Sequence, residues 1–311
     1  MVLHALFSAV LLVALASCPA ARAEVYSYDD NATVIGAVSV ATITGKGESL
    51  IEKAREFGLG YNEIAAANPG LDPFIPGKGE MITVPRSWVL PRVPSYDGLV
   101  INLSEMRLYA FLKKGKDGRR LVATFPIGIG AEGNDTPTGA FTVVEKRENP
   151  SWHVPESIRK ERPGLPRVVP PGPDNPLGSH ALRLSLGSLL VHGTNRPWGV
   201  GRRVSHGCIR LYPEDIPRLY QLTPVGAKVV IVRQPVKIGV REGRIHIEVH
   251  EDPAGPVHER YDYYDEAMLL LTRMGLDAGR IDYDRLEQAI KEKSGVPVDI
   301  SDRGFMQDTT P

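Results

Sequence analysis

The sequence has few cysteines and no excess of charge of either sign. Cys18 and Cys208 are its two cysteines, and Cys18 lies in a segment that we expect to be removed. One remaining thiol cannot form an internal disulfide, which excludes a small fold stapled by disulfides. Lysine plus arginine and aspartate plus glutamate both number 37. This balance argues against a nucleic acid as partner.

The chain also lacks an apolar run near its start that is long enough to span a bilayer. The run at residues 6–16 has roughly eleven residues, and a small-x-small cleavage site follows at residues 21–23. We therefore predict that residues 1–23 are a signal peptide and that the protein is exported. In an alternative interpretation, residues 15–18 form a lipoprotein cleavage box, and Cys18 would be the lipidated first residue.

Residues 191–212 concentrate the polar groups that covalent catalysis needs. In this stretch, VHGTNRPWGVGRRVSHGCIRLY, Cys208 follows Ser205, His206 and Gly207, and His192 lies well upstream. A thiol becomes a strong nucleophile only when it loses its proton, and a nearby imidazole can accept that proton. Either histidine could be the base. We favour His192, because it can approach Cys208 from a neighbouring strand.

The surroundings of Cys208 favour catalysis over two other roles. Gly207 has no Cβ, so the chain could pass close to a substrate carbonyl, and backbone N–H groups near Cys208 could bind an oxyanion. A lone cysteine is more often a small buried residue. His192, His206 and Cys208 could also be zinc ligands, but a convincing fourth ligand is missing.

The motifs HGT at residues 192–194 and SHGCIR at residues 205–210 resemble the signature of L,D-transpeptidases with a YkuD-type catalytic domain. The resemblance implies that Cys208 is the acyl-accepting nucleophile and His192 the general base. It implies that Arg210 helps to bind the donor peptide; many members have asparagine there, but exported enzymes of Gram-negative bacteria commonly have arginine. With the predicted signal peptide, we expect the protein in the periplasm. The remaining expected pocket or substrate-binding residues are Ser205, His206, Gly207, Gly193, Thr194 and Trp198, the last of which could instead be a packing residue.

Residues 39–85 predict a compact module with the order strand, helix, helix, strand. Ser49 can cap a first helix whose apolar residues recur at helical spacing, and a second helix over residues 61–67 ends at the Asn-Pro-Gly of residues 68–70. The unit resembles a LysM module, a family that binds the N-acetylglucosamine-containing glycan of peptidoglycan. A capping domain without a ligand is the alternative.

The catalytic domain is predicted at residues 98–234, after a polar lead-in at residues 24–38 and a proline-containing linker at residues 86–97. Short strands rich in β-branched and aromatic residues, with one clear helix near residues 213–222, indicate a mainly β sandwich or barrel-like domain. The resemblance implies the YkuD fold for this segment. The expected strands cover residues 99–103, 106–112, 121–127, 141–144, 181–186, 189–191, 208–211 and 228–232.

Four features inside this domain need interpretation. Residues 128–133 match the dinucleotide-binding pattern G-x-G-x-x-G, but residues 134–139 cannot open a helix cleanly, so we predict a turn that leads into a strand. The proline-rich segment 149–177 predicts a lid over the substrate groove, because long ordered loops tend to carry function. His180 could be a pocket or a surface residue. Arginines between the two histidines, namely Arg196, Arg202 and Arg203, would make the groove positive.

Beyond residue 235 the pattern predicts a small α/β accessory subdomain at residues 236–300. A hairpin over residues 236–249 is followed by helices near residues 263–274 and 283–293, and residues 301–311 predict a disordered tail. The overall fold class is α+β. The length of the chain fits two or three modest domains.

These features together predict an exported L,D-transpeptidase that works through a cysteine thioester and needs neither a cofactor nor a metal. The donor would be the tetrapeptide stem of peptidoglycan. The acceptor stays open between diaminopimelate, which would give 3-3 cross-links, and an outer-membrane lipoprotein. An L,D-carboxypeptidase or amidase that uses water and a non-catalytic wall-binding protein are the alternatives. Carbapenems acylate the cysteine of this family, so we expect them to modify Cys208.

Overall fold

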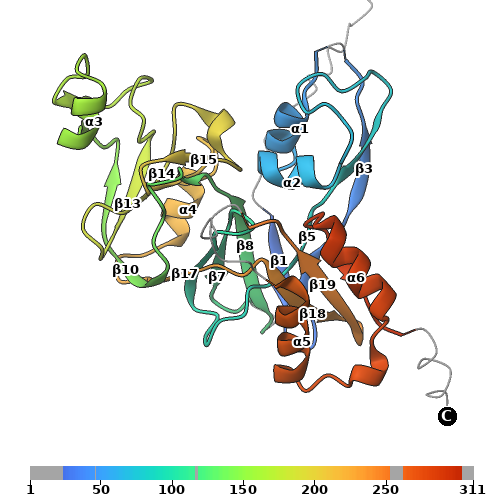
Figure 1. Ribbon diagram of the computed structural model, residues 1–311. Coiled ribbons are helices and arrows are strands. Elements are labelled where there is room, and N and C mark those ends of the chain that lie inside the picture. Colours follow the sequence, from blue (N-terminus) through green and yellow to red (C-terminus); the bar gives the residue numbers. More distant parts are fainter. Residues whose placement is uncertain (1–23, 46, 116–117, 253–261, 303–311) are drawn as a thin grey trace, which may run out of the picture.

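The computed structural model describes residues 24–45, 47–115, 118–252 and 262–302 (Figure 1). The predicted signal peptide with Cys18, and residues 303–311 of the predicted tail, lie outside the described residues. Ser301, predicted to begin the disordered tail, is instead buried, and its hydroxyl accepts from Ile245 N at 2.7 Å. Within the described ranges, every helix is too short or too polar to cross a bilayer.

A curled sheet forms the centre of the protein. Among the described residues it has nine strands in the order β1-β8-β7-β6-β17-β10-β13-β14-β16. Neighbouring strands are antiparallel except for the parallel pairs β6·β17 and β14·β16. All eight strands predicted for the catalytic domain are confirmed. The nine strands are Val25–Tyr28 (β1), Gly98–Asn102 (β6), Arg107–Leu112 (β7), Arg120–Pro126 (β8), Gly139–Glu148 (β10), His180–Leu184 (β13), Leu190–His192 (β14), Ile209–Arg210 (β16) and Lys228–Val232 (β17).

The buried core of this sheet contains side chains from strands near both ends of the strand order. Phe125 of β8 belongs to the same buried cluster as Val191 of β14 and Ile209 of β16, and Leu219 of helix α4 (Ile216–Leu222) completes it. The prediction of a mainly β domain with one main helix is confirmed. The turn predicted to lead into β10 is confirmed, whereas the two-residue strand β9 (Ile129–Gly130) within the glycine pattern was not predicted.

The N-terminal module (residues 39–85) has the predicted element order: β3 (Ser39–Thr42), α1 (Leu50–Glu56), α2 (Tyr61–Ala66) and β4 (Met81–Val84). Strands β3 and β4 pair antiparallel. Ser49 caps α1 through a capping box, in which its hydroxyl accepts from Glu52 N and its own N–H donates to the Glu52 carboxylate. The two helices pack over this two-stranded sheet in one buried cluster.

Two segments predicted to be a lead-in and a linker are part of the core instead. Residues 24–38 contain β1, which pairs with β8, and β2 (Val34–Gly36), which pairs with β5 (Ser87–Val89). The prolines around residues 86–97 indicated a linker, but the apolar run Trp88-Val89-Leu90 between them is buried. The free energy of burying these side chains outweighs the local preference of the prolines for an extended, exposed chain.

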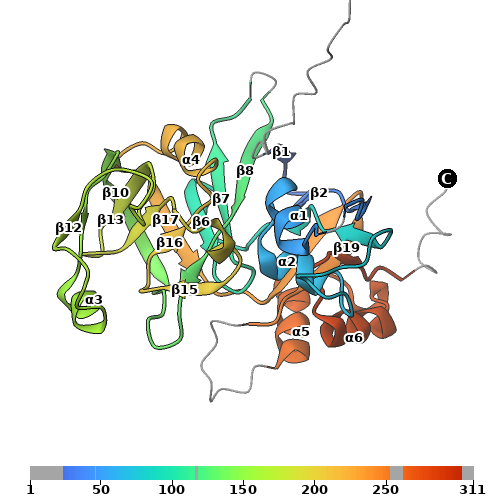
Figure 2. The ribbon, with the colours of Figure 1, turned by 90° about the horizontal axis from the view of Figure 1, so that it is seen from above.

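The C-terminal subdomain has its own core. It contains the hairpin β18 (Val236–Arg241) and β19 (Arg244–Val249), and the helices α5 (Tyr263–Arg273) and α6 (Tyr283–Glu292). The predicted hairpin and both predicted helices are confirmed. A short 3-10 helix, η2 (Ala278–Arg280), joins the helices, and β20 (Val298–Asp299) pairs with β19. In both views α5 and α6 lie at the opposite end of the molecule from helix α3 (Glu156–Glu161), which belongs to the proline-rich segment 149–177 (Figures 1 and 2).

The proline-rich segment 149–177 folds into an ordered cover. It contains α3 and a two-stranded sheet of β11 (Trp152–His153) and β12 (Val168–Val169). Asn175 is fully buried at its base, where the amide Nδ2 donates to the Pro150 carbonyl oxygen at 2.8 Å and Oδ1 accepts from Leu177 N at 2.9 Å. These bonds close the segment on itself. We refer to it as the lid.

Candidate active site

The parallel pairing of β14 with β16 brings the two predicted catalytic residues to one cleft. Val191 pairs with Ile209 and His192 with Arg210, and Cys208 immediately precedes β16. Alternate residues of a strand point to the same face, so Leu190 and His192 share a face with Cys208 and Arg210. All four line a cleft of about 290 Å³.

Cys208 lies partly buried in this cleft as a thiol. Its Sγ is 3.6 Å from the Ser188 carbonyl oxygen, to which it donates. Burial raises the pKa of the thiol above its ordinary value, although the Leu190 N–H and the Arg210 guanidinium oppose that change. The sulfur is therefore protonated at neutral pH.

His192 is buried and electrically neutral. Burial and, second, the Arg210 guanidinium lower its pKa from 6.5 to about 4, against the hydrogen bonds to the carbonyls of Gly193 and Leu177. Its Nδ1 lies 2.6 Å from the Gly193 carbonyl oxygen. A carbonyl can only accept, so Nδ1 carries the proton and the neutral ring keeps the lone pair on Nε2. This is the tautomer that a general base needs.

The sulfur of Cys208 and the imidazole of His192 line the same cleft but are not hydrogen-bonded to each other. Among the described residues, the hydrogen-bond partner of Cys208 Sγ is Ser188 and neither histidine. Catalytic hydrogen bonds are often long before substrate binds. His206 Nε2 lies 3.2 Å from Glu161 Oε2 at the end of the lid helix, so its ring connects the motif to the lid.

The turn before Cys208 is held by three polar contacts that sequence reasoning did not identify. The Ser205 hydroxyl donates to the Cys208 carbonyl at 2.5 Å. Thr136 Oγ1 accepts from Gly130 N and donates to the Gly207 carbonyl, both at 2.9 Å. Gly207 has a φ of +96°, a left-handed conformation that favours glycine. The signal for Thr136 was its place in the turn at residues 134–139.

Three of the predicted substrate-binding residues, Gly193, Thr194 and Trp198, lie around the cleft rather than in its wall. Gly193 contributes the carbonyl that orients His192. Thr194 is buried, and its hydroxyl accepts from Arg196 N at 2.9 Å. Trp198 lies on the 3-10 helix η1 (Pro197–Gly199) with 48% of its surface exposed. Ser205, His206 and Arg210 do line the cleft.

Cations of three strands make the cleft positive. Arg210 Nε is buried without a hydrogen-bond partner among the described residues. On the neighbouring strands β10 and β13 of the same sheet, Arg147 and Arg183 share the Glu145 carboxylate, at 2.5 and 2.6 Å. The arginines predicted to supply this charge, Arg196, Arg202 and Arg203, are not among the residues that line the cleft, and Arg203 pairs with Asp135. Arg147 and Arg183 were missed because they lie far from the motif in sequence.

The lid supplies the remaining wall of the cleft. Pro150, Trp152, Pro155, Ile158 and Leu177 all line it. His180 lies outside the lining, with its ring 4.6 Å from the Tyr220 ring and Nδ1 2.9 Å from Ser179 Oγ. An apolar cover of this kind excludes water from the reacting groups when substrate is bound.

A buried cluster elsewhere has the composition of a metal site but already contains a cation. Among the described residues, the side chains of Glu105, Glu248 and His250 place ligand atoms within 4.8 Å of one another, whereas His192, His206 and Cys208 do not converge in this way. The Lys237 ammonium lies 2.7 Å from Glu105 and 2.8 Å from Glu248. It takes the position that a metal ion would need.

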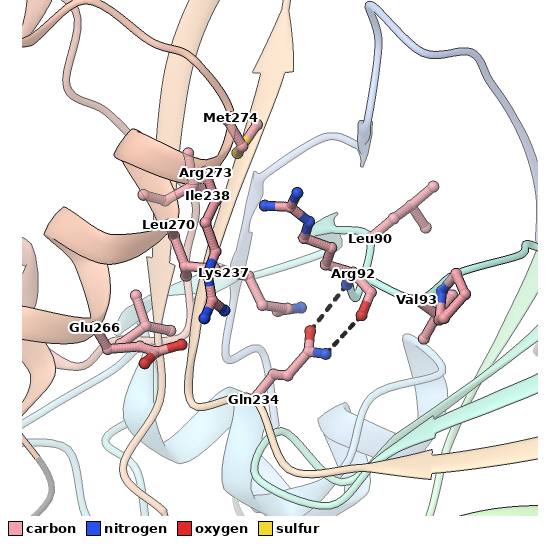
Figure 3. Close-up of a pocket in the computed structure, with 12 residues that line it drawn as sticks. Leu90, Arg92, Val93, Gln234, Lys237, Ile238, Glu266, Leu270, Arg273 and Met274 are labelled. Carbon is pink, nitrogen blue, oxygen red and sulfur yellow. Dashed lines mark hydrogen bonds between the residues drawn. The ribbon is translucent and has the colours of Figure 1, made fainter.

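A larger cleft of about 510 Å³ lies between residues 90–94, β18 and α5 (Figure 3). The Gln234 side chain bonds the backbone N–H and carbonyl of Arg92 at 2.9 and 2.7 Å, and Ile238 and Leu270 contribute apolar surface. No cysteine, serine or histidine lines this cleft among the described residues. Its chemistry does not suit acyl transfer, so the smaller cleft at Cys208 is the candidate active site.

Comparisons with known proteins identify the family of the domain that contains this cleft. Residues 97–231 match the family model of the L,D-transpeptidase catalytic domain (YkuD). Three proteins of Escherichia coli are similar over most of their length. The probable L,D-transpeptidase YcfS is 37% identical, with 86% of this chain and 85% of that protein covered. The probable L,D-transpeptidase YbiS is 38% identical, with 97% of this chain and 99% of that protein covered. The probable L,D-transpeptidase ErfK/SrfK is 39% identical, with 80% of this chain and 81% of that protein covered.

Proposed function

This chain belongs to the L,D-transpeptidase family with the YkuD catalytic domain, and we propose that Cys208 and His192 perform its acyl transfer on peptide stems of peptidoglycan in the periplasm. The observation that carries the proposal is the β14·β16 pairing, which presents both side chains to one positive, lid-covered cleft. The periplasmic location rests on the predicted signal peptide at residues 1–23.

The first half of the reaction would form a thioester. Cys208 Sγ attacks the carbonyl at the L-centre of diaminopimelate, and its proton moves to His192 Nε2. Backbone N–H groups of the Gly207–Cys208 turn would bind the oxyanion. When the carbon–nitrogen bond breaks, His192 returns the proton to the leaving amine of D-alanine. Because burial raises the pKa of the Cys208 thiol and lowers that of His192, the proton transfer would accompany the attack on the carbonyl.

The second half would regenerate the thiol. The acceptor amine enters the cleft and attacks the thioester carbonyl, His192 takes a proton from that amine, and the sulfur leaves and recovers its proton. The bond energy of the donor amide is retained in the thioester, so the step needs no nucleotide. Arg210, Arg147 and Arg183 would attract the carboxylates of an acidic stem peptide.

Incubation with a disaccharide tetrapeptide, followed by mass spectrometry, tests the proposal. We expect cross-linked dimers and released D-alanine. Tripeptide alone would indicate a hydrolase that uses water as acceptor. An unchanged substrate would leave the wall-binding role as the remaining function. Adding a lysine-terminated peptide to the same reaction would detect a lipoprotein-like acceptor.

The dependence of kcat/KM on pH should report the low pKa of His192. The neutral ring is the active base, and its pKa is about 4, so activity should persist through pH 6 and fall as the pH drops through about 4. An acid limb near 6.5, the ordinary value for histidine, would contradict the assignment. The His206→Gln variant is the control, because it should keep the midpoint of the wild type.

We further propose that the N-terminal module binds glycan through the exposed end of its residues 70–80. Phe74 and Ile75 are 57% and 79% exposed there. Deleting the whole module is not a usable test, since its Leu50 and Ile64 share a buried cluster with Tyr109 of the catalytic sheet. A point substitution leaves that core intact.

Phe74→Ser should reduce binding to purified cell-wall sacculi about ten-fold. Burying a phenylalanine contributes about 1.5 kcal/mol or more, and 1.4 kcal/mol is a factor of about ten in affinity. Val225→Ser is the matched control, because Val225 is 61% exposed on the catalytic domain. If Phe74→Ser and Val225→Ser bound sacculi equally well, Phe74 would not be part of the glycan site.

A further inference from the structure

The N-terminal module contacts the segment that joins the two catalytic residues. This junction loop, residues 197–203, lies between His192 and Cys208 in the sequence. Tyr61 N, at the start of α2, donates to the Val200 carbonyl at 3.3 Å. Just beyond Cys208, the Tyr212 hydroxyl donates to the Leu59 carbonyl at 3.0 Å. The module therefore bonds to the chain on both sides of the nucleophile.

At the centre of this contact two backbones touch. Gly201 has a φ of +78°, and a Cβ on it would lie 2.2 Å from Tyr61 N. A Cβ on Gly60 would lie 2.9 Å from Gly201 Cα. Both distances are shorter than any real Cβ contact, and the neighbours are backbone atoms that cannot rotate away. The fit between the module and the loop therefore depends on glycine at both positions.

Charged groups hold the same junction. Arg55 of α1 makes a two-point contact with Glu214, at 2.7 and 2.8 Å. Glu63 of α2 and Arg107 of β7 form a fully buried ion pair at 2.7 Å, and the Arg107 guanidinium lies 4.1 Å from the centre of the Trp88 ring. Paired charges without solvent impose a defined geometry, since any displacement leaves a buried charge alone.

The junction loop transmits this position to the nucleophile through backbone bonds. Gly201 N donates to the Ile127 carbonyl at 2.9 Å, and Ala131 N donates to the Ser205 carbonyl at 2.8 Å. The loop runs directly into β15 (Arg203–Ser205), which pairs with β9. Ser205 in turn bonds the Cys208 carbonyl. Each step is a short, rigid contact.

We propose that the N-terminal module is a positioning element of the active site, which holds the junction loop, and through it the Ser205–Cys208 turn, by the Gly60–Gly201 contact and the Tyr212–Leu59 hydrogen bond. The inference rests on the proposed function in that Cys208 is the reacting residue. It goes further, because the module then contributes to turnover of substrates too small to reach its glycan-binding surface. Misplacing a reacting group by about 1 Å can cost a factor of about 100 in rate.

The test compares Gly201→Ala with Gly226→Ala. Gly226 has a similar φ of +85°, but nothing lies within 4 Å of the position that a Cβ would take there, so this variant reproduces the backbone strain without the junction. On the disaccharide tetrapeptide, Gly201→Ala should lower kcat roughly ten- to hundred-fold with little change in KM. Gly226→Ala should retain the kcat of the wild type. Equal kcat values in the two variants would overturn the proposal.

Tyr212→Phe keeps the proposal falsifiable if Gly201→Ala does not fold. It retains the ring and removes only the bond to Leu59, and we expect kcat to fall roughly two- to five-fold, which corresponds to one hydrogen bond. The rate of Cys208 acylation by a carbapenem, followed by intact mass, is the second measurement. It should fall in parallel for both junction variants. If the wild type is acylated but does not turn over the peptide, the proposed function fails, and the acylation rate still tests the positioning role. If Gly201→Ala and Tyr212→Phe are both acylated at the wild-type rate, the positioning role is refuted.

Discussion

Cys208→Ala is expected to abolish transpeptidation, with a loss of turnover on the order of 10⁴-fold or more, as for the removal of other covalent nucleophiles. Two neighbouring polar side chains of the cleft are already engaged and should not replace the thiol. The Ser205 hydroxyl is bound to the Cys208 carbonyl, and the ring of His206 points to Glu161. Turnover of the disaccharide tetrapeptide, measured by mass spectrometry, checks this prediction.

The same variant should remain folded and keep its affinity for sacculi. The side chain is small and partly exposed, so removing its sulfur should change the melting temperature little. Loss of the carbapenem adduct should accompany loss of turnover, because both require the same sulfur. Activity retained in Cys208→Ala would disprove the nucleophile assignment.

Lys237→Met is expected to destabilise the protein by about 3–5 kcal/mol, the range for removing one partner of a buried ion pair. The Lys237 ammonium is 1% exposed and donates to the Glu105 and Glu248 carboxylates and to the Val89 carbonyl. These groups come from the catalytic domain, the C-terminal hairpin and β5. Without the ammonium, two buried carboxylates face each other. Thermal or urea unfolding measures the loss.

The destabilisation should depend on pH with a defined sign. Burial raises the pKa of Glu105, with the Lys237 ammonium opposing, whereas for Glu248 the ammonium and His250 outweigh burial and lower the pKa. In Lys237→Met the pKa of both carboxyls should lie above the unfolded value of about 4.3. Groups with a raised pKa stabilise the fold below the unfolded pKa and lose that contribution as the pH rises. The difference in the free energy of unfolding between Lys237→Met and the wild type should therefore be largest at neutral pH and become smaller toward pH 4.

Lys228→Met is the matched control for this substitution. Lys228 pairs with Asp97 at 3.0 Å, but both side chains are more than 60% exposed. Exposed pairs contribute about 0–1 kcal/mol, so this variant should unfold close to the wild type. If the two variants were equally stable, the Lys237 cluster would not hold the domains together.

Much of the secondary structure was predictable because its signals are local. The capping box at Ser49 and the glycines after α1 specify helix ends within a few residues, and the strands of the catalytic domain were visible as short β-branched runs between turns. The turn at residues 134–139 was also correct in outline, and the segment predicted as a lid is ordered and lines one side of the cleft. In each case the deciding interactions lie within a few positions along the chain.

The errors occurred where distant residues decide burial. Residues 86–97 carry the prolines of a linker, yet Trp88 and Val89 are buried because the module, the sheet and the C-terminal hairpin meet around them. The partners Glu63 and Arg107 are 44 positions apart, and Glu105 and Lys237 are 132 positions apart. A charged residue in a sequence predicts a solvated surface unless its partner is known.

The sequence by itself determined which residues can do the chemistry, because a cysteine in SHGC and a histidine in HGT are recognisable wherever the chain places them. Only the tertiary structure decided that the two lie in one cleft, that burial shifts the pKa of each, and that the N-terminal module contacts the loop between them. The physical reason is that nucleophilic character belongs to a side chain, whereas its pKa and position depend on burial and on contacts with residues far away along the chain.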